Sequence, residues 1–294
     1  MIAIITDDPG WHGKQLLQCF IERGLDAKFV RLQDCHFDLT GASALLQIKG
    51  FTELPCAVFV RGIPGGSLEQ VVYYLDVLHA MEALGIRVMN NVRCIERSVD
   101  KGMTSFILKQ HQINTPKTIY SSDYHFIYRK LREGLEAGTD FVLKPVFGSQ
   151  GQGLQKISDT SQLVDLSPMH GVAYLQEFID SGYAHGVDFR VFVIAGQVIA
   201  SMKRVGDSWI TNVAQGGSVE AIDIGTEAEQ MAIKSAHVLD MDYAGVDLIR
   251  DKQGVFWVTE VNSVPAWKGL QGTTQVQIAD AICAHFIAQS GLSL

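Results

Sequence analysis

The segment from Val255 to Leu270 reads V-F-W-V-T-E-V-N-S-V-P-A-W-K-G-L. Its first four residues have the composition of a buried strand. Glu260 and Asn262 stand two positions apart, so on a strand both side chains point to the same face. Carboxylate and amide oxygens are hard ligands that suit Mg²⁺. The segment therefore predicts a strand that ends in two candidate metal ligands.

The preceding segment A-G-V-D-L-I-R, residues 244–250, is a second predicted strand, and the D-K-Q-G between the two is a turn sequence. A hairpin closed on that turn sets Arg250 opposite Val255 and Asp247 opposite Val258. We therefore expect the two strands to form an antiparallel pair.

In this register Asp247 shares a face with Glu260 and Asn262, and Glu260 is its diagonal neighbour. Diagonal neighbours lie roughly 7–8 Å apart, which is within reach of one shared cation. The hypothesis is a Mg²⁺ site, with Mn²⁺ as an alternative metal. The competing interpretation is a set of strand-end carboxylates that face water.

Length and composition narrow the class of protein. The 294 residues suggest two or three domains, and 47% of them are hydrophobic, as in a well-packed globular protein. A net charge of −8 argues against nucleic acid as a partner. The longest apolar runs stay below 18 residues, so we expect no membrane span. Five scattered cysteines without a C-x-x-C pattern indicate reduced thiols and a cytoplasmic location.

Residues 1–90 alternate strands and helices, which predicts a parallel α/β domain. Ligands of such sheets gather at the carboxyl ends of the strands, where Asp7 to Gly10 and Arg61-Gly62 stand. No G-x-G-x-x-G is present, which disfavours a dinucleotide site. Arg61 either binds an anionic group of a substrate or is a solvated strand-end charge.

Two further domains are expected, at 91–180 and 181–294. Helices are predicted at 11–23, 68–84, 98–110, 122–137, 226–239 and 274–289. Strands are predicted at 2–5, 27–32, 57–61, 88–90, 117–120, 140–146 and 173–179, with a long hairpin over 187–204 and the final pair described above.

A candidate phosphate site follows from D-F-V-L-K-P-V-F-G-S-Q-G-Q-G-L, residues 140–154. Glycines let a backbone approach a phosphate closely, and exposed N–H groups supply donors. Half of such loops are simply hairpins, and the order of a P-loop is absent. Lys144 is more informative, because a lysine inside an apolar strand needs an anionic partner from the protein or from a ligand.

The remaining charged residues complete a set suited to phosphoryl transfer. Asp188 and Arg190 share a face of the long hairpin, Arg204 lies on its second strand, and Lys101 stands in the first turns of a predicted helix. Cations that neutralise developing charge and a flap that excludes water are what this chemistry needs.

Eight motifs in this order resemble the ATP-grasp superfamily, and most closely its RimK-like carboxylate–amine ligases. They are D-K at 100–101, K-P-V-F-G-S-Q-G-Q-G at 144–153, Q-E-F-I at 176–179, D-x-R at 188–190, K-R at 203–204, N-V-A-Q-G-G at 212–217, G-V-D at 245–247 and E-V-N-S-V-P at 260–265. The resemblance covers essentially the whole chain. It implies an ATP-grasp fold of the mixed α/β (α+β) class, with a Rossmann-like N-terminal domain and ATP held between two antiparallel-sheet subdomains.

The resemblance also implies a role for each matching residue. ATP would be bound by Lys101, Lys144, Gly148, Ser149, Gln150, Gly151, Gln176, Glu177, Phe178, Ile179, Asp188 and Thr211. The lysines would contact its phosphates, residues 176–179 its adenine and Asp188 its ribose. The metal ligands would be Asp247, Glu260 and Asn262. Arg190, Arg204 and Asn212 would steady the transferred phosphoryl group.

The implied reaction activates a carboxylate as an acyl phosphate and joins it to an amine, most simply that of L-glutamate. The acceptor would be a coenzyme, another small molecule or a protein C-terminus, and relatives suggest a homo-oligomer. Trp267 is large where ligases of the ribosomal protein S6 have a smaller residue, so it either stacks on a ring-bearing acceptor or packs a domain. The alternatives are a D-alanine–D-alanine or amino-carrier type of ligase, and a non-catalytic ATP-binding protein.

Overall fold

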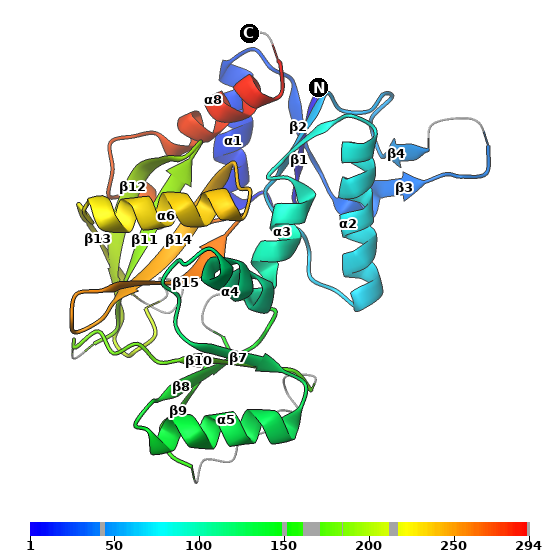
Figure 1. Ribbon diagram of the computed structural model, residues 1–294. Helices are drawn as coiled ribbons and strands as arrows, with labels where there is room; N and C mark the ends of the chain where they lie inside the picture. Colours follow the sequence, from blue (N-terminus) through cyan, green and yellow to red (C-terminus); the bar gives the residue numbers. More distant parts are fainter. Residues whose placement is uncertain (42–44, 149–151, 161–170, 184, 212–216, 293–294) are drawn as a thin grey trace. The chain divides into compact units, whose positions relative to one another are not determined.

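The computed structural model describes residues 1–41, 45–148, 152–160, 171–183, 185–211 and 217–292. The chain forms two compact units, whose elements are labelled in Figure 1. Unit 1 comprises Met1–Ile95, Asp240–Ala244 and Ser263–Leu294, and unit 2 comprises Glu96–Leu239 and Gly245–Asn262. The division into three domains at 1–90, 91–180 and 181–294 is finer than this and stays a prediction.

Unit 1 is built on a parallel sheet with the strand order β2-β1-β5-β6. Every residue of β1 and β5 is buried, because continuous apolar runs form strands that are covered on both faces. The bounds are Ile2–Ile5 for β1, Ala27–Val30 for β2, Ala57–Val60 for β5 and Arg87–Met89 for β6. The expected α/β architecture of this part of the chain is thereby confirmed.

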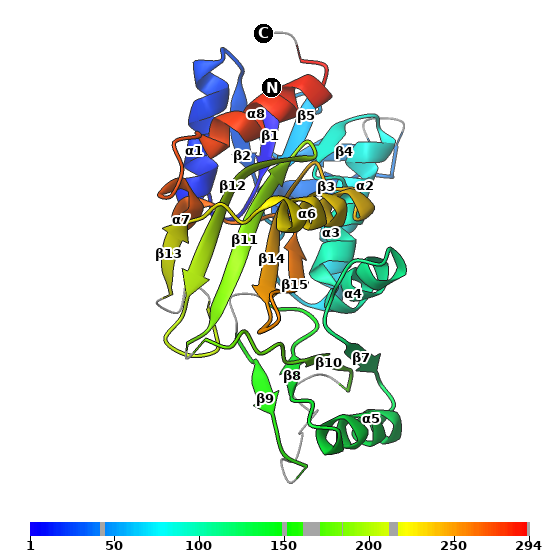
Figure 2. The ribbon, with the colours of Figure 1, turned by 60° about the vertical axis from the view of Figure 1, so that its left-hand side comes forward.

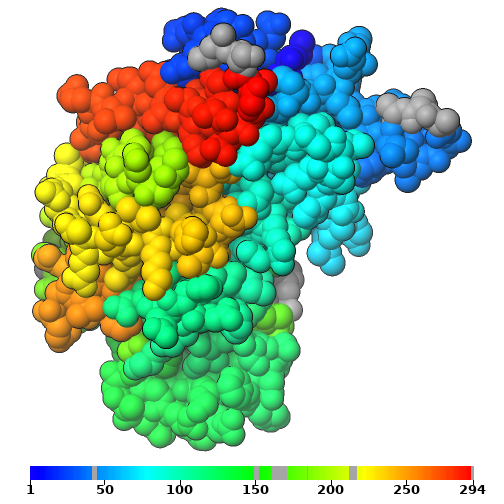
Figure 3. Space-filling view, turned by 45° about the horizontal axis from the view of Figure 1, so that its top comes forward, coloured from blue at the N-terminus to red at the C-terminus, as the bar shows by residue number. Residues whose placement is uncertain are grey.

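Helices complete unit 1. The first and last helices of the chain, α1 and α8, pack on each other, as Figure 2 and Figure 3 show. Helix α2 begins with a capping box, in which the Ser67 hydroxyl accepts from the N–H of Gln70 and the Gln70 side chain accepts from the N–H of Ser67. The helices are α1 Gly10–Glu22, α2 Leu68–Ala83, α7 Lys268–Gln271 and α8 Ile278–Gln289, and a hairpin of β3 Cys35–Phe37 and β4 Leu46–Ile48 follows the short helix η1 Leu32–Asp34.

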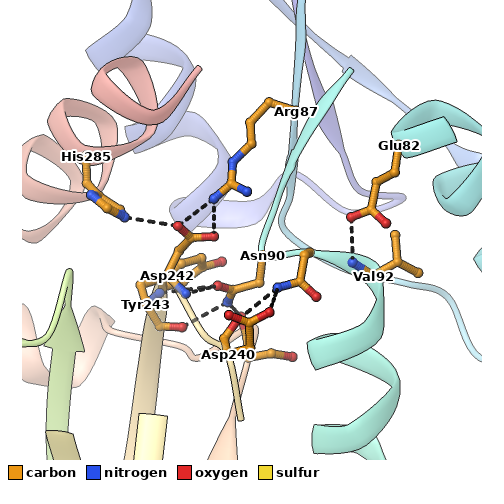
Figure 4. Close-up of polar contacts among 10 residues, drawn as sticks. Glu82, Arg87, Asn90, Val92, Asp240, Asp242, Tyr243 and His285 are labelled. Atoms are coloured by element: carbon orange, nitrogen blue, oxygen red, sulfur yellow. Dashed lines mark hydrogen bonds and ion pairs between the residues drawn. The ribbon is translucent and has the colours of Figure 1, made fainter. Parts of the chain in front are cut away.

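A buried asparagine joins the three segments of unit 1 (Figure 4). Asn90 has no exposed surface. Its amide nitrogen donates to the carbonyl oxygens of Tyr243 at 2.9 Å and Ser263 at 2.6 Å. Its side-chain oxygen accepts from the N–H groups of Asp242 at 2.7 Å and Tyr243 at 3.2 Å. One side chain therefore satisfies backbone groups that lie more than 150 residues away in sequence.

An ion pair lies beside this asparagine. The carboxylate of Asp242 accepts from Arg87, with both oxygens 2.6 Å from one guanidinium nitrogen, and lies 3.2 Å from Nε2 of His285 (Figure 4). The neighbouring Asn91 side chain donates to the backbone carbonyl and the carboxylate of Asp240. These contacts fix residues 240–244 against the first 95 residues of the chain.

Unit 2 contains two sheets. The first is antiparallel, with the order β7-β10-β8-β9, and α5 covers one of its faces. Gly134 lets this helix lie close to the sheet, because a Cβ there would meet the ring of Phe141 at 2.5 Å. The bounds are β7 Thr118–Ser121, α5 Tyr124–Glu136, β8 Phe141–Lys144, β9 Gln155–Ile157 and β10 Ala173–Glu177.

The second sheet of unit 2 has the order β13-β12-β11-β14-β15 (Figure 2). Strands β11 and β12 form the predicted long hairpin, which turns at Ala195-Gly196 with both residues at positive φ. Helices α4 and α6 pack on β15 and on each other. The bounds are α4 Lys101–Gln110, β11 Val187–Ile194, β12 Gln197–Val205, β13 Ser218–Ala221, α6 Thr226–Val238, β14 Tyr243–Arg250 and β15 Phe256–Asn262.

Two of the predictions for individual elements are wrong. The single helix expected at 98–110 is two helices, α3 Val92–Val99 and α4, because the Asp100 side chain caps the N–H of Met103 and starts a new helix. The register of the last hairpin also differs, since Arg250 pairs with Phe256 and Asp247 with Glu260. A turn with Gly254 at φ +89° shifts the pairing by one residue, and a bulge at Thr259 shifts it by another.

Several short elements were not predicted, namely η1, β3, β4, α3, β9, β13 and α7. The five cysteines are free, as expected. Among the residues that the structure describes, no helix combines the length and apolar character needed to cross a lipid bilayer.

Candidate active site

One pocket of unit 2 brings most of the predicted site residues together. Residues of both sheets line it, with β8 and β10 on one side and β11, β12, β14 and β15 on the other. The predicted residues among its lining are Lys101, Lys144, Gly148, Gln176, Glu177, Phe178, Ile179, Asp188, Arg204, Thr211, Asp247 and Glu260.

The other predicted residues are placed differently. Arg190 and Asn262 belong to the same sheet as the pocket but are absent from its lining. Arg61 and Trp267 belong to unit 1. Ser149, Gln150, Gly151 and Asn212 lie outside the described residues.

Two half-buried lysines face the pocket without a carboxylate partner among the described residues. Nζ of Lys144 donates to the side-chain oxygen of Gln176 at 2.6 Å, and burial lowers the pKa of Lys144 to about 8. Nζ of Lys101 donates to the carbonyl oxygens of Gly148 at 2.8 Å and Val146 at 3.3 Å. Burial also lowers the pKa of Lys101. The anionic partner that the sequence predicts for Lys144 is thus left to a ligand.

Glu260 is the acidic neighbour of these lysines. Its charge acts on the pKa of both of them and opposes the effect of burial. The Glu260 side chain is half-buried and makes no hydrogen bond or ion pair with any described residue. Among the described residues, the pocket therefore presents two lysines without a counterion and the carboxylate of Glu260, whose oxygens are available to a ligand.

The apolar part of the pocket adjoins the end of β10. It is lined by Val142, Leu154, Phe178, Trp209, Ile210 and Ile249. The N–H groups of Glu177 and Phe178 already donate to Lys117 and Asp140, each at 2.8 Å. The N–H of Ile179 makes no backbone hydrogen bond within the described chain, so it remains available to a polar edge of a planar ligand.

A network of two arginines and two aspartates connects strands β11, β12 and β14 at the wall of the pocket. Arg204 donates to both oxygens of Asp188, at 2.6 and 2.5 Å, and reaches Asp247 at 2.9 Å. Arg190 binds both oxygens of Asp247 at 2.7 Å. Thr211 donates to Asp188 at 2.6 Å. These are paired, charge-assisted hydrogen bonds, which hold each side chain in one orientation.

The electrostatics of the network follow from this pairing. Burial opposes the charge of Arg204, yet Asp247 and Asp188 raise the pKa of its guanidinium overall. Burial likewise opposes ionisation of Asp247, yet Arg190 and Arg204 lower its pKa to about 2. Asp188, expected to contact a ribose, is occupied by Arg204 and Thr211, so that contact stays a prediction.

The three proposed metal ligands lie on adjacent strands. Asp247 is directly opposite Glu260, and such pairs have Cβ atoms about 4.5–5.5 Å apart. Asn262 follows two residues later, and its side chain makes no hydrogen bond with the described residues. The described residues hold no metal-binding group of three or more His, Cys, Asp or Glu. The oxygen donors of Glu260 and Asn262 fit Mg²⁺, while Asp247 would have to share its oxygens with the arginines.

Sequence reasoning missed part of the pocket wall. The indole of Trp209 lies 6.0 Å from the ring of Phe178, edge to face. Two glycines allow this wall to fold inward, because a Cβ on Gly186 would meet the oxygen of Ser208 at 2.4 Å and one on Gly206 the oxygen of Ile210 at 2.0 Å. Gly186 and Gly206, which flank the β11–β12 hairpin, were the sequence signal that could have predicted this wall.

Known proteins are similar to this chain over most of its length. A family model described as the RimK-like ATP-grasp domain matches residues 98–286. The tetrahydromethanopterin:alpha-L-glutamate ligase of Methanococcus maripaludis is 34% identical over 237 residues, which cover 79% of this chain and 78% of that protein. A probable alpha-L-glutamate ligase of Cellvibrio japonicus is 28% identical over 297 residues, covering 97% and 94%.

Solved structures share the fold. The ATP-grasp ligase PsnB, in complex with a phosphomimetic variant of its minimal precursor, Mg and ADP, matches with a TM-score of 0.76. The match covers 98% of each chain at 22% sequence identity. Identity at this level supports the fold alone.

Proposed function

Because this chain belongs to the RimK-like ATP-grasp family, we propose that it uses ATP and Mg²⁺ to join a substrate carboxylate to an amine through an acyl phosphate. The chain is a ligase of carbon–nitrogen bonds on a fold that binds ATP. The observation that carries the proposal is the pair of half-buried lysines, Lys101 and Lys144, beside the unpaired carboxylate of Glu260. Two unbalanced cations in a pocket suit the polyphosphate of a nucleotide.

The two halves of the pocket suit different parts of the nucleotide. The apolar wall around Phe178 and Trp209 would take the adenine, and the N–H of Ile179 would bind its polar edge. Lys101 and Lys144 would bind the phosphates. Each lysine is held by neutral oxygen atoms, so its charge remains available to the ligand.

Glu260 and Asn262, with Asp247, would hold Mg²⁺ between the nucleotide and β15. Such an ion neutralises charge that develops on the transferred phosphoryl group and on the departing phosphate. The direct pairing of Asp247 with Glu260 supports this assignment.

The chemical steps need positioned charge and no enzyme nucleophile. An oxygen of the substrate carboxylate attacks the γ-phosphorus of ATP, the bond to the β-phosphate oxygen breaks, and ADP leaves. The amine nitrogen then attacks the acyl carbon, inorganic phosphate leaves, and the nitrogen loses a proton. Arg190 and Arg204 would steady the phosphoryl group together with Asn212. Asp188 and Asp247 fix the orientation of the two arginines.

The substrates are proposed from the names of similar proteins. Relatives named as alpha-L-glutamate ligases support L-glutamate as the amine. The acceptor carboxylate would belong to a coenzyme such as tetrahydromethanopterin, to another small molecule or to a protein. These names give no support to a D-alanine–D-alanine or amino-carrier ligase. A non-catalytic nucleotide-binding role is the alternative that the product assay tests.

The test is product mass spectrometry. The protein is incubated with ATP, Mg²⁺ and L-glutamate, in one arm with tetrahydromethanopterin and a small-molecule extract and in another with a purified S6-type protein. A glutamate-sized mass added to an acceptor, with equimolar ADP, is the expected result. Absence of ADP in every arm would contradict the proposal and favour a non-catalytic nucleotide-binding protein.

A further inference from the structure

The parallel sheet of unit 1 has a topological switch point that the proposed function leaves unused. The chain leaves β1 through α1 to pair β2 on one side, and returns later to place β5 on the other side of β1. In open parallel sheets, ligands bind in the crevice outside the carboxyl ends of the two strands where the order reverses. Arg61 directly follows β5, and His12 lies in the first turn of α1, which follows β1.

Arg61 carries an unbalanced charge at this point. Its guanidinium has five N–H donors. Within the described residues they make one hydrogen bond, from a terminal nitrogen to the carbonyl oxygen of Val264 at 3.3 Å. Its Nε is buried without a partner, and no carboxylate among the described residues pairs with the group. Burial lowers the pKa of Arg61, which shows how poorly the surroundings compensate its charge.

An aromatic cluster packs against the guanidinium of Arg61. The guanidinium carbon lies 5.3 Å from the ring centre of Trp267, which is fully buried. The Trp267 ring in turn contacts the rings of Trp11 and His12. Burial of this kind favours the packing interpretation of Trp267 over stacking on a substrate, and it makes the tryptophan a fixed support for Arg61.

His12 is held as a neutral donor. Its Nε2 accepts from the N–H groups of both Trp267 and Lys268, each at 3.1 Å. A nitrogen that accepts two hydrogen bonds carries no proton, so the proton of the ring is on Nδ1. Burial, Arg61 and Lys268 together lower the pKa of His12 to about 4, which keeps the ring neutral at physiological pH. The Nδ1–H makes no hydrogen bond with the described residues.

We propose that the carboxyl ends of β1 and β5 form a binding site for a carboxylate group of one of the two ligase substrates, with Arg61 as its ion partner and His12 as a neutral N–H donor. The inference rests on the proposed function and adds a substrate contact to it. One cation and one neutral donor match the single charge of a carboxylate. The phosphate end of the unit 2 pocket, by contrast, offers two lysines.

The test follows the Arg61 Nε–H signal by nitrogen-15 NMR, since Nε makes no hydrogen bond with the part of the chain that the structure describes. The signal is assigned by its absence from Arg61→Met. Glutarate is the probe, and its neutral diamide is the control ligand. We expect glutarate to shift the Arg61 signal, and Arg61→Met to weaken glutarate binding at least about tenfold, as for a lost charge-assisted hydrogen bond. The diamide should shift nothing.

Two further variants separate binding from structure. Arg31→Met removes an arginine of unit 1 that is exposed and paired with Asp34, and it should leave glutarate binding unchanged. Arg61→Lys should retain part of the affinity, because it keeps the charge. The melting temperature of Arg61→Met should not fall, since the variant removes an unbalanced charge and keeps an apolar stem over Trp267. Glutarate binding that is absent, or equal in wild type and Arg61→Met, would overturn the inference.

Substrate titrations then identify which carboxylate binds. If the site takes the amino acid, Arg61→Met raises the KM for L-glutamate and leaves the KM for ATP unchanged. If it takes the acceptor, the KM for the acceptor found by mass spectrometry rises instead. Ligase activity with every KM unchanged in Arg61→Met would refute the inference and leave the proposed function standing. An inactive wild type would refute the proposed function, while the glutarate experiment would still decide the site.

Discussion

Two polar regions of this molecule differ in whether their charged side chains have partners. In unit 1, Asp242 is bound by Arg87 and His285, and Asn90 makes four hydrogen bonds to backbone groups (Figure 4). In the unit 2 pocket, Lys101 and Lys144 donate to neutral oxygens. Glu260 has no ion pair or hydrogen bond among the described residues.

The paired groups of unit 1 stabilise the protein, whereas the unpaired groups of the unit 2 pocket are available to a ligand. A buried group with all its partners costs a great deal to disrupt, because removing one partner leaves the others unsatisfied. A half-buried charge without a counterion lowers stability and is retained where a ligand supplies the partner. Substitutions in the network of Asn90 and Asp242 should therefore change stability, and substitutions of Lys101, Lys144 or Glu260 should change activity.

The largest effect is expected for Glu260→Gln. The amide keeps the size of the side chain and removes the charge that would hold Mg²⁺, so ATP turnover should fall about a thousandfold. The melting temperature should change little, since Glu260 makes no hydrogen bond or ion pair with the described residues and only its charge acts on Lys101 and Lys144. ADP release measures the first quantity and calorimetry the second. Glu133→Gln, on the outer helix α5, is the matched control. Undiminished turnover in Glu260→Gln would refute its assignment as a metal ligand.

A large effect on stability is expected for Asn90→Leu. The leucine has a similar volume and leaves the backbone groups of Asp242, Tyr243 and Ser263 without their partners. The free energy of unfolding should fall by about 3 kcal/mol. Urea unfolding measures it, and the Kd for ATP should be unchanged in the folded protein.

Asn91→Ala is the matched control for this region. Asn91 caps the N–H of Cys94 and donates to Asp240, so its loss should cost about 1 kcal/mol, as for a helix cap. An Asn90 variant no less stable than the Asn91 variant would mean that the buried network does not hold unit 1 together.

A smaller change is expected for Lys144→Met. The variant removes a charge-assisted contact to phosphate, so the Kd for ATP should rise about 10- to 100-fold. The melting temperature should not fall, because the charge is unbalanced in the free protein. Calorimetric titration provides the Kd, and Lys130→Met, at an exposed lysine paired with Glu133, is the control. Reduced stability with unchanged affinity would place Lys144 among the structural residues.

Much of the fold was predictable, because local patterns determine it. Buried runs such as Ile2–Ile5 and Ala57–Val60 became the expected strands, and Gly24 and Gly85 follow the ends of the first two long helices. The division of helices α3 and α4 was missed although its signal was local. Asp100 is a good N-cap residue, and it stands where the single helix was expected to continue.

The sequence predicted most of the charged residues that line the pocket, but not how they pair with one another. Strand composition cannot reveal the bulge at Thr259, which alters which residue faces Asp247. Nor can it reveal that Arg190 and Arg204 converge on the same carboxylate, since Asp247 is 57 residues beyond Arg190. Such contacts depend on how separate strands join, and this information lies in the tertiary structure.

The smallest expected effect is a pH dependence of nucleotide binding. It tests the unpaired charge of Lys144 without a substitution in either region. Burial lowers the pKa of Lys144 to about 8, against the opposing charge of Glu260 and with a smaller contribution from the charge of Lys101. The protonated lysine binds phosphate, so affinity is lost as pH rises through this value. Between pH 7 and pH 9 the charged fraction should fall about tenfold, and the Kd for ATP should rise by the same factor.

The contribution of Lys144 is the difference between wild type and Lys144→Arg, because arginine keeps its charge over this range. This difference removes the titration of ATP itself and that of Lys101, whose pKa burial also lowers. The variant should bind ATP with a Kd that varies less with pH than that of the wild type. Equal pH profiles would mean that the charge of Lys144 is not used by the nucleotide, and the contrast between paired and unpaired charges would then rest on Lys101 and Glu260 alone.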